Sequence, residues 1–376
     1  MIFKAARENM EHCLSIAKSI TSAKPQLSIL TNVLLESKED RVFVTATDLE
    51  VGIRSSFEAV VEEPGSTTIN AAKLFGAVMQ FPQEEILVEI DSKNEFKIRS
   101  SDQKIKAQFT LKGLGCESYP KFPMLPDDLP RFSIAQGTLR EMIKKTLFAI
   151  STEVSRQYLN GVFFETEKKI FRLVATDGRR LAKIEKTCDY SDEKEMGMIV
   201  PQKVLTELSH TLGNEGLVEI AFSENQIFFS FNNIVYASNI IDGHFPNYNQ
   251  VIPKSQDKKL TTRRETFINI LNRSTLLADE RQNNQIRFDF QSGYAVVSVH
   301  NTDAGSYSDE LAIEYAGENI EIAFNIKFLR DFFKELICED ISMEMGTPVS
   351  PVIMRPADDE NYLYVVMPMK INSESL

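Results

Sequence analysis

A carboxylate followed by guanidinium groups is the arrangement in this sequence with the clearest capacity for chemistry. In "LVATDGRRLA" (173–182), Asp177 comes directly after a short apolar run and is followed by one Gly and two Arg residues. Such a carboxylate can act as a general base while the cations stabilise developing negative charge. A similar stretch, "VTATDLEVGI" (44–53), places Asp48 in the same setting. The sequence therefore poses a choice between a catalytic pair and a repeated structural turn.

A third, weaker copy of this stretch favours the structural turn. Asn301 stands at the matching place, and a side-chain amide cannot serve as a general base. An Asp at the end of a strand commonly accepts hydrogen bonds from backbone N–H groups, and we interpret Asp48 and Asp177 in this way. An enzyme that uses Asp177 with Arg179 or Arg180 stays open as an alternative. It predicts that Asp177→Asn abolishes turnover.

The other reactive residue types lack the spacing of a catalytic or metal site. The four His residues show no metal-ligand spacing with Cys or carboxylates, and the four Cys residues form no CxxC pair. Widely spaced cysteines predict free thiols in a reducing compartment. The sequence also contains neither a Walker-type phosphate loop nor GxGxxG. We therefore predict no enzyme activity, no cofactor and no metal.

The charge balance restricts the possible partners. Among 376 residues, 42 Lys and Arg oppose 54 Asp and Glu, which gives a net charge of −12. The molecule as a whole repels nucleic acid, so DNA binding requires basic side chains gathered on one face. The N-terminus lacks a signal-peptide core, and no apolar run approaches the length of a membrane span. We expect a cytoplasmic protein.

Landmarks of different chemistry recur along the chain with one long period. Segments beginning at Asn70, Pro201 and Asn325 resemble one another, and aromatic-Pro units recur with similar offsets. The period is too long for the repeats of about 20–50 residues that build solenoids, so each copy is a domain. We predict three homologous domains, at residues 1–125, 126–253 and 254–376.

Each copy combines helical stripes with strand patterns. Leu139, Ile143, Leu147 and Ile150 share one face of a helix predicted over 137–154. Equivalent stripes are Met10, Leu14, Ala17 and Thr21 in the first copy and Phe267, Leu271 and Ser274 in the third. A second helix follows each Asn or Pro landmark, where Asn caps a helix and Pro suits its first turn. Segments such as "RVFVTAT" (41–47) indicate strands, so the predicted class is α+β, mostly antiparallel, with about two helices per domain.

Basic residues fall in or beside the predicted helices of all three copies. Helices on one side of similar half-domains could concentrate this charge on a common face, as sequence-independent DNA binding requires. The residues are Lys18, Lys24, Lys73, Arg140, Lys144, Lys145, Arg156, Lys203, Arg263, Arg264, Arg273, Lys327, Arg330 and Lys334. In the second copy, Arg140, Lys144 and Lys145 are expected to face away from the apolar stripe.

Several long motifs in order resemble the bacterial β sliding clamp family, the processivity subunit of the replicative DNA polymerase III. They are "KPQLSILTNVLLE" (24–36), "TDLE" (47–50), "YLNGVFFETE" with "VATDGRRLA" (158–182), "DGHFPNYNQVIP" (242–253) and "YVVMPM" (364–369). The resemblance implies a head-to-tail homodimer whose six domains close a ring around duplex DNA, with helices lining the hole and sheets outside. Such a ring slides without sequence specificity and tethers the polymerase, the clamp loader and other partners, without catalysis.

Site residues also follow from the resemblance, motif by motif. Lys24, Arg156, Tyr158 and Lys203 match positions that touch DNA, and Leu276 with Leu277 matches a hydrophobic part of the subunit interface. Glu153, Gln157, Arg179 and Gln250 differ from common forms of the family pattern. The implied partner-peptide pocket comprises Leu159, Thr176, Gly178, Arg179, Arg180, Leu181, Pro246, Val251, Asn325, Phe328, Val349, Val365, Met367, Pro368 and Met369. A monomeric three-domain adaptor that binds peptides but not DNA remains a further alternative.

Overall fold

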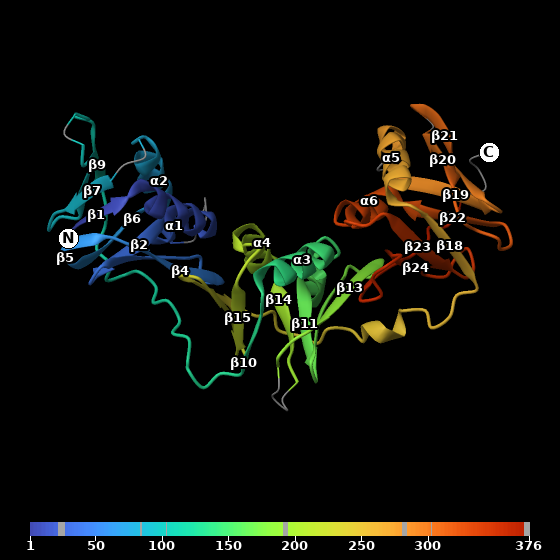
Figure 1. The fold of residues 1–376 in the computed structure, drawn as a ribbon, viewed down its shortest axis with the longest axis horizontal. Coiled ribbons are helices and arrows are strands. Elements are labelled where there is room, and N and C mark those ends of the chain that lie inside the picture. Colours follow the sequence, from blue (N-terminus) through green and yellow to red (C-terminus); the bar gives the residue numbers. More distant parts are fainter. Residues whose placement is uncertain are drawn as a thin grey trace. The chain divides into compact units, whose positions relative to one another are not determined.

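The computed structural model describes residues 1–21, 27–82, 85–102, 104–190, 195–279, 284–301 and 303–371. It consists of three repeats with one order of elements: a strand, a helix, a group of strands, a second helix and three further strands (Figure 1). The three homologous α+β domains with two α-helices each, expected from the sequence, are therefore present. No helix among the described residues is long and apolar enough to cross a membrane.

Among its described residues, the first repeat contains nine strands, one short strand more than each of the others. Its elements are β1 (Ile2–Ala6), α1 (Arg7–Ile20), β2 (Asn32–Lys38), β3 (Arg41–Thr47), β4 (Val51–Glu58), β5 (Val60–Glu63), β6 (Gly65–Asn70), α2 (Ala71–Met79), β7 (Glu85–Ile90), β8 (Glu95–Ser100) and β9 (Gln108–Lys112). The strand predicted over 41–47 coincides with β3.

The second and third repeats share one pattern without the extra strand. The second has β10 (Arg131–Ala135), α3 (Gln136–Leu147), β11 (Gly161–Glu167), β12 (Ile170–Thr176), β13 (Arg180–Thr187), β14 (Gly197–Pro201), α4 (Gln202–Thr211), β15 (Leu217–Phe222), β16 (Gln226–Phe231) and β17 (Ile234–Asn239). The third has β18 (Lys258–Arg263), α5 (Arg264–Ser274), β19 (Gln285–Gln291), β20 (Tyr294–Asn301), β21 (Gly305–Ala312), β22 (Ile320–Asn325), α6 (Ile326–Lys334), β23 (Asp340–Met345), β24 (Val352–Pro356) and β25 (Tyr362–Val366).

Strand pairing between consecutive repeats builds two large antiparallel sheets. β17 of the second repeat pairs with β4 of the first, and β25 of the third pairs with β13 of the second. The resulting eight-stranded sheets run β10-β15-β16-β17-β4-β3-β2-β6 and β14-β11-β12-β13-β25-β24-β23-β18. Two smaller sheets remain, β5-β1-β7-β8-β9 and β21-β20-β19-β22, and β9 and β21 are edge strands of these sheets among the described residues.

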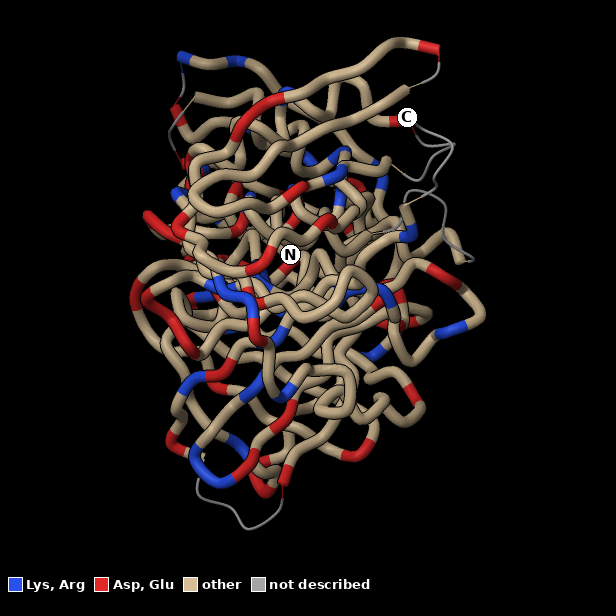
Figure 2. Tube along the Cα trace, turned by 90° about the vertical axis from the view of Figure 1, so that its right-hand side faces the viewer, with Lys and Arg blue, Asp and Glu red and all other residues tan. Residues whose placement is uncertain are grey.

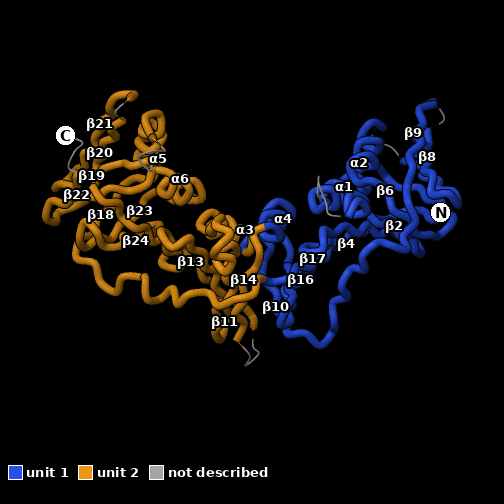
Figure 3. The backbone as a smooth tube through the Cα atoms, turned by 180° about the vertical axis from the view of Figure 1, so that it is seen from behind, with its two compact units in different colours: residues 1–138, 203–240 blue, residues 139–202, 241–376 orange. Residues whose placement is uncertain are grey.

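The described chain forms two compact units, shown in different colours in Figure 3. Unit 1 comprises 1–138 with 203–240, and unit 2 comprises 139–202 with 241–376. Each unit holds one eight-stranded sheet and one smaller sheet. The division runs through the second repeat, so it differs from the predicted boundaries at 125 and 253, which stay predictions.

The apolar stripes of the first helices lie in the core, as predicted, with local differences at their ends. Met10, Leu14 and Ala17 are buried in α1, but Ile20 completes the stripe because Thr21 already caps the helix. In the second repeat the helix ends at Leu147 rather than at 154. The backbone N–H groups that follow bond three residues back, so the α-helix tightens into a turn.

Lys145 is a correction to the expected charged face of α3. Its side chain is 11% exposed instead of facing solvent, because the ammonium pairs with Glu141 at 2.5 Å and lies 5.0 Å from the ring centre of Tyr362. The hydroxyl of Tyr362 donates in turn to the Lys145 carbonyl at 2.8 Å. Lys145, which was expected at the solvent face, is thus buried against Tyr362 of β25, a strand far along the sequence.

The second helices begin at the landmarks that the sequence marked. The side chains of Asn70 and Asn325 each accept a hydrogen bond from a backbone N–H in the first turn, at 3.0 and 2.9 Å. Pro201 instead ends β14, and α4 begins one residue later. In the third repeat, Phe267 of α5 stacks on Phe333 of α6 with ring centres 4.5 Å apart, which holds the helix pair together.

The aromatic-Pro unit of the first repeat contributes a buried hydroxyl. Tyr119 is buried, and its Oη donates towards the carbonyl oxygens of Asn32 and Thr45, at 3.0 and 3.2 Å. Burial raises the pKa of this phenol, so the group keeps its proton and remains a donor. One side chain thereby fastens the segment after β9 to β2 and β3.

Replacing Tyr119 with Phe should lower the free energy of unfolding by about 1–2 kcal/mol, because two buried carbonyls lose their shared donor. The change is measured from urea unfolding followed by circular dichroism. Tyr294→Phe is the matched control, since its hydroxyl bonds at the exposed surface, and it should change stability by less than about 0.5 kcal/mol. Equal losses in both variants would contradict the role given to Tyr119.

Candidate functional site

The Asp-containing turns that opened the sequence question have the same geometry in all three repeats. In each, one side-chain oxygen accepts hydrogen bonds from the backbone N–H groups two and three residues further on, at 2.8–3.0 Å. The acceptor is Asp48 in the first repeat, Asp177 in the second and Asn301 in the third. A single oxygen suffices, which is why Asn can replace Asp. The structural interpretation of these residues is confirmed.

The second carboxylate oxygen of Asp177 binds Arg180 at 3.0 Å. The guanidinium of Arg180 also donates to Asp331 of α6 at 2.7 Å and to the carbonyl of Phe148 at 2.6 Å. The ring of Phe328 lies 4.5 Å from the same group. Arg180 is therefore fully engaged, and both oxygens of Asp177 are occupied. The enzyme alternative gains no support from this arrangement.

Arg180 keeps its charge although it is largely buried. Burial by itself lowers the pKa of the guanidinium, but Tyr364, Asp331 and Asp177 act in the opposite direction and the net pKa is raised. The cation ties the turn of the second repeat to helix α6 of the third, since Asp331 and Phe328 both lie on α6. It forms a fixed part of the predicted pocket wall and is not a free donor for a ligand.

The C-terminal segment passes directly beside this turn. Strand β25 pairs with β13, and the N–H of Met367 continues the pairing by donating to the Arg179 carbonyl at 2.9 Å. Two residues later the N–H of Met369 donates to Ala323 of β22 at 2.7 Å. The backbone is thus fixed on both sides while the Met367 side chain stays 41% exposed. The segment can offer a thioether to an apolar ligand.

The segment 245–252 is anchored through alternate side chains. Phe245 stacks on Phe163 with ring centres 4.9 Å apart, and Tyr248 is buried in an apolar cluster with Leu181 and Val365. The Tyr248 hydroxyl donates to Glu165 at 2.6 Å. Burial first, and then this bond, raise the pKa of Tyr248, so the phenol remains protonated. These anchors leave two predicted pocket residues, Pro246 and Val251, at the surface.

The remaining predicted pocket residues occupy different kinds of position, all in unit 2. Thr176 accepts the N–H of Gly178 and donates to the Arg180 carbonyl, while Gly178 has φ +85°, which a side chain would strain. Asn325 caps α6. Leu159 is buried at the end of a short 3₁₀ turn, Val349 is exposed between β23 and β24, and Pro368 is half-buried.

A cleft of about 380 Å³ lies beside the Asp177 turn. Its walls come from the turn itself, from the segment that follows α3 and from Phe328 of α6. The lining residues are Leu147, Phe148, Ile150, Ser151, Thr152, Glu153, Asp177, Arg179, Arg180, Gln202 and Phe328.

The residues expected to touch DNA are placed unevenly. Lys24 lies outside the described residues. Arg156 pairs with Glu153 at 3.5 Å, and its Nη1 is 3.2 Å from the point that a Cβ on Gly178 would occupy. A proposed DNA contact and a proposed pocket residue are thus neighbours. Tyr158 is partly exposed, and Lys203 pairs with Asp48.

Other basic residues near the helices also have acidic partners. Arg263 pairs with Glu339, and Arg273 of α5 pairs with Asp309 of β21. Figure 2 shows Lys and Arg interspersed with Asp and Glu along the trace. Several of the basic side chains predicted in or beside the helices are therefore paired with carboxylates. Lys73, Lys144, Lys327, Arg330 and Lys334 are exposed on their helices.

Sequence reasoning missed the partners that hold the pocket wall. Asp331 and Phe148 bind Arg180, and Glu165 binds Tyr248. The hydroxyl of Tyr364 donates to the Phe328 carbonyl at 2.9 Å. None of these residues stands in a pattern that distinguishes it from ordinary helix or strand positions. The continuous apolar run "YVVMPM" is the signal that could have placed Tyr364 in a buried strand.

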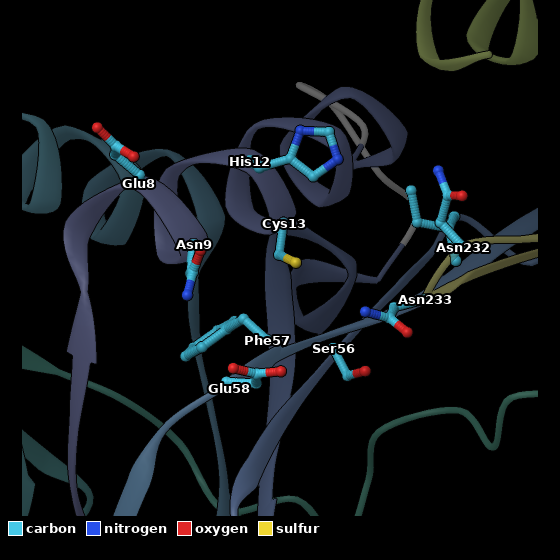
Figure 4. Close-up of a pocket in the computed structure, with 10 residues that line it drawn as sticks. Glu8, Asn9, His12, Cys13, Ser56, Phe57, Glu58, Asn232 and Asn233 are labelled. Atoms are coloured by element: carbon cyan, nitrogen blue, oxygen red, sulfur yellow. The ribbon is translucent and has the colours of Figure 1, made fainter. Parts of the chain in front are cut away.

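A second cleft, of about 350 Å³, lies in unit 1 between α1, the end of β4 and the turn joining β16 to β17. Figure 4 shows its labelled polar side chains spaced around the opening rather than converging on one point. His12 and Cys13 are neighbours in sequence but lie on different faces of α1, one exposed and one buried. Within the described residues, no group of three His, Cys, Asp or Glu side chains is arranged to hold a metal ion.

Replacing Arg180 with Lys should lower the free energy of unfolding by about 2–3 kcal/mol, because one ammonium cannot reach three acceptors in different directions. Chemical denaturation of the purified protein measures the change. Arg179→Lys is the control on the neighbouring residue, whose side chain is exposed, and it should alter stability by less than about 0.5 kcal/mol. A neutral Arg180→Lys substitution would mean that the guanidinium does not hold α6 to the turn.

Comparison with known proteins gives one consistent family. Models of the DNA polymerase III beta subunit match residues 1–123 as its N-terminal domain, 133–247 as its central domain and 249–370 as its C-terminal domain. The beta sliding clamp of Pseudomonas aeruginosa is 30% identical and covers 99% of this chain and 100% of its own length. That of Synechocystis is 31% identical and covers 95% and 96%.

Solved structures agree with the sequence comparison. The sliding clamp from Bacillus subtilis has a TM-score of 0.93 at 26% identity, with 99% of this chain and 100% of that chain covered. The sliding clamp from Bartonella birtlesii bound to griselimycin has a TM-score of 0.92 at 31% identity, with the same coverage. With the three repeats and their sheet order, these matches show that the chain belongs to the family of DNA polymerase III beta subunits, the beta sliding clamps.

Proposed function

We propose that two copies of this chain close head to tail into a six-domain ring that encircles duplex DNA in the cytoplasm. The observation that carries this proposal is the incomplete state of two sheets. Each eight-stranded sheet combines the last three strands and the first strand of one repeat with four strands of the repeat before it. The five-stranded and four-stranded sheets are the two halves left over.

The leftover halves have complementary ends. By position in the repeat, β9 corresponds to β17 and β25, while β21 corresponds to β4 and β13. β17 pairs with β4 and β25 with β13, so β9 of one copy has the edge that matches β21 of another. Pairing them would complete two further sheets and cover edges that otherwise promote aggregation. A head-to-tail dimer follows from the same rule that joins the repeats within one chain.

An exposed leucine lies near the free edge. Leu276 is 85% exposed in the short 3₁₀ turn after α5, and this turn packs against β21. Leu277 in the same turn is half-buried. An apolar side chain at this position is suited to burial when β21 gains a partner strand. We therefore assign Leu276 and Leu277 to the dimer interface.

Single-particle imaging of the purified protein at micromolar concentration tests ring closure. The wild type is expected to give six-lobed rings with an open centre, and Leu276→Asp is expected to give three-lobed arcs, because a buried charge at the interface opposes association. Arcs from the wild type at every concentration would contradict the ring and favour the monomeric adaptor. The exposed residue Met124, changed to Asp, is the control that should leave the rings intact.

Duplex DNA is the partner that fits such a ring. Lys24, Arg156, Tyr158 and Lys203 are proposed to contact the phosphates and sugars from within it. Attraction to phosphate is independent of sequence, so a few weak contacts permit sliding where base contacts would stop it. The clamp thereby tethers the replicative polymerase without catalysing a reaction.

The surface around Met367 is the proposed site for peptides of the polymerase, the clamp loader and other partners. Its supports are the exposed thioether of Met367 on a fixed backbone and the exposed Pro246 and Val251 on an anchored segment. Sliding clamps from Pseudomonas aeruginosa and Bartonella birtlesii have been solved bound to griselimycin, which supports the view that a clamp of this family offers a ligand-binding surface.

Replacing Met367 and Met369 together with Ala should weaken binding of a labelled polymerase peptide about tenfold or more, because two apolar contacts are lost. Fluorescence anisotropy measures the affinity, and imaging of the same sample should still show rings. Met124→Ala is the matched control, an exposed methionine in unit 1. Unchanged affinity in the double variant would contradict the assignment of the pocket.

A further inference from the structure

The proposed DNA contact Lys203 is paired with an acidic residue of the neighbouring repeat. Its Nζ binds Oδ2 of Asp48, while Oδ1 of the same carboxylate accepts the two backbone N–H groups of its turn. Lys203 lies in the first turn of α4 and Asp48 in the turn between β3 and β4. The side chain of Lys203 remains 37% exposed, whereas that of Asp48 is only 12% exposed. The lysine is thus held at the surface by a more buried anion.

The pair is embedded in a frame that fixes its two members. β4 pairs with β17 in the same sheet, and Asn239 of β17 donates to the Leu49 carbonyl at 3.3 Å. One helical turn after Lys203, Glu207 accepts a hydrogen bond from Ser19 of α1. All of these residues belong to unit 1. Contacts within unit 1 therefore hold the two elements that carry Asp48 and Lys203.

Comparison among the repeats separates the two tasks of Asp48. Asn301 makes the same pair of turn hydrogen bonds with its single carbonyl oxygen, and its amide nitrogen donates to the Leu277 carbonyl at 3.3 Å. The turn thus needs no negative charge. In the second repeat the extra oxygen of Asp177 binds Arg180. The charge of Asp48 consequently acts on Lys203 and is dispensable for the local fold.

We propose that Asp48 attenuates the hold of this clamp on DNA by neutralising Lys203. This inference rests on the proposed DNA-encircling function. A free ammonium attracts a phosphate as a full charge and displaces a condensed counterion when it binds. A lysine paired with a carboxylate acts as a dipole, whose attraction is weaker and falls off faster with distance. The ion pair keeps Lys203 at the proposed DNA-binding position but weakens its attraction to phosphate, so that the lysine slows sliding less.

The experiment measures binding of fluorescently labelled duplex DNA to the full-length protein over a series of salt concentrations. Four proteins form a cycle: wild type, Asp48→Asn, Lys203→Gln and the double variant. Asp48→Asn should tighten binding about fivefold at low salt and steepen the dependence of log affinity on log salt by about 0.9, as expected for one added phosphate contact. With Lys203→Gln in the same chain, most of this gain should disappear.

Two controls distinguish attenuation from simpler effects. Glu50→Gln removes an exposed negative charge two residues from Asp48, and it should change affinity less than twofold. Thermal unfolding should show Asp48→Asn folded, since Asn301 supports the same turn. A gain from Asp48→Asn that persists undiminished in the Lys203→Gln background would reveal general repulsion and overturn the proposal. Weaker binding by Asp48→Asn would make Asp48 an orienting residue and overturn it too.

Failure of the underlying DNA role has a different signature. Arg156→Gln should weaken DNA binding of the wild-type protein whether or not Asp48 attenuates Lys203. If it does so while Asp48→Asn leaves affinity unchanged, only the attenuation is wrong. If no protein in the set binds duplex DNA even at low salt, the proposed function and the attenuation are both overturned.

Discussion

The unpaired edge of a β-sheet is the constraint on which the rest of this structure depends. A strand at an edge exposes backbone donors and acceptors that another strand will satisfy. Where consecutive repeats meet, the chain satisfies four such edges by pairing β17 with β4 and β25 with β13. The turns at Asp48 and Asp177 directly precede β4 and β13, the strands that form these two joints. Among the described strands, the corresponding edges at β9 and β21 have no partner strand within the chain.

The Asp turns also connect consecutive repeats, through side-chain ion pairs near the same joints. Each turn needs one side-chain oxygen, and the second oxygen of Asp is available for a cation. In unit 1 that cation comes from the following repeat, as Lys203, whereas in unit 2 it is Arg180, which continues to Asp331 of the following repeat. At both joints an ion pair connects the turn to the second helix of the following repeat. The helix residue is the cation Lys203 on α4 but the anion Asp331 on α6.

The sequence predicted what depends on local periodicity and missed what depends on distant partners. The three copies, their helix pairs and the Asn caps at Asn70 and Asn325 were all visible in the sequence, because apolar spacing and capping act over a few residues. The burial of Lys145 was not predictable, since its partner Tyr362 is far away in sequence and only β25 brings it near. The early end of the helix at Leu147 likewise had no distinguishing residue pattern.

The candidate site shows the same limit. Motif resemblance selected the turn around Gly178 and the segment at Met367 that follows β25, and the structure places both in unit 2, joined by a backbone hydrogen bond. The resemblance gave no indication that the Arg180 side chain is hydrogen-bonded to Asp331 and Phe148. An Arg that lines a pocket and an Arg that supports its wall look alike in sequence. The distinction lies in three guanidinium nitrogens that donate to acceptors from three separate segments.

The adjacent residues Arg179 and Arg180 therefore differ in their freedom to change. Arg179 contributes its carbonyl to the pairing with Met367, and any amino acid supplies a carbonyl. The exposed side chain of Arg179 borders the cleft beside the Asp177 turn. Arg180 is bound in place through its side chain. Substitution of Arg179 therefore leaves the strand pairing intact. Substitution of Arg180 removes its bond to Asp331 and requires compensating changes on α6.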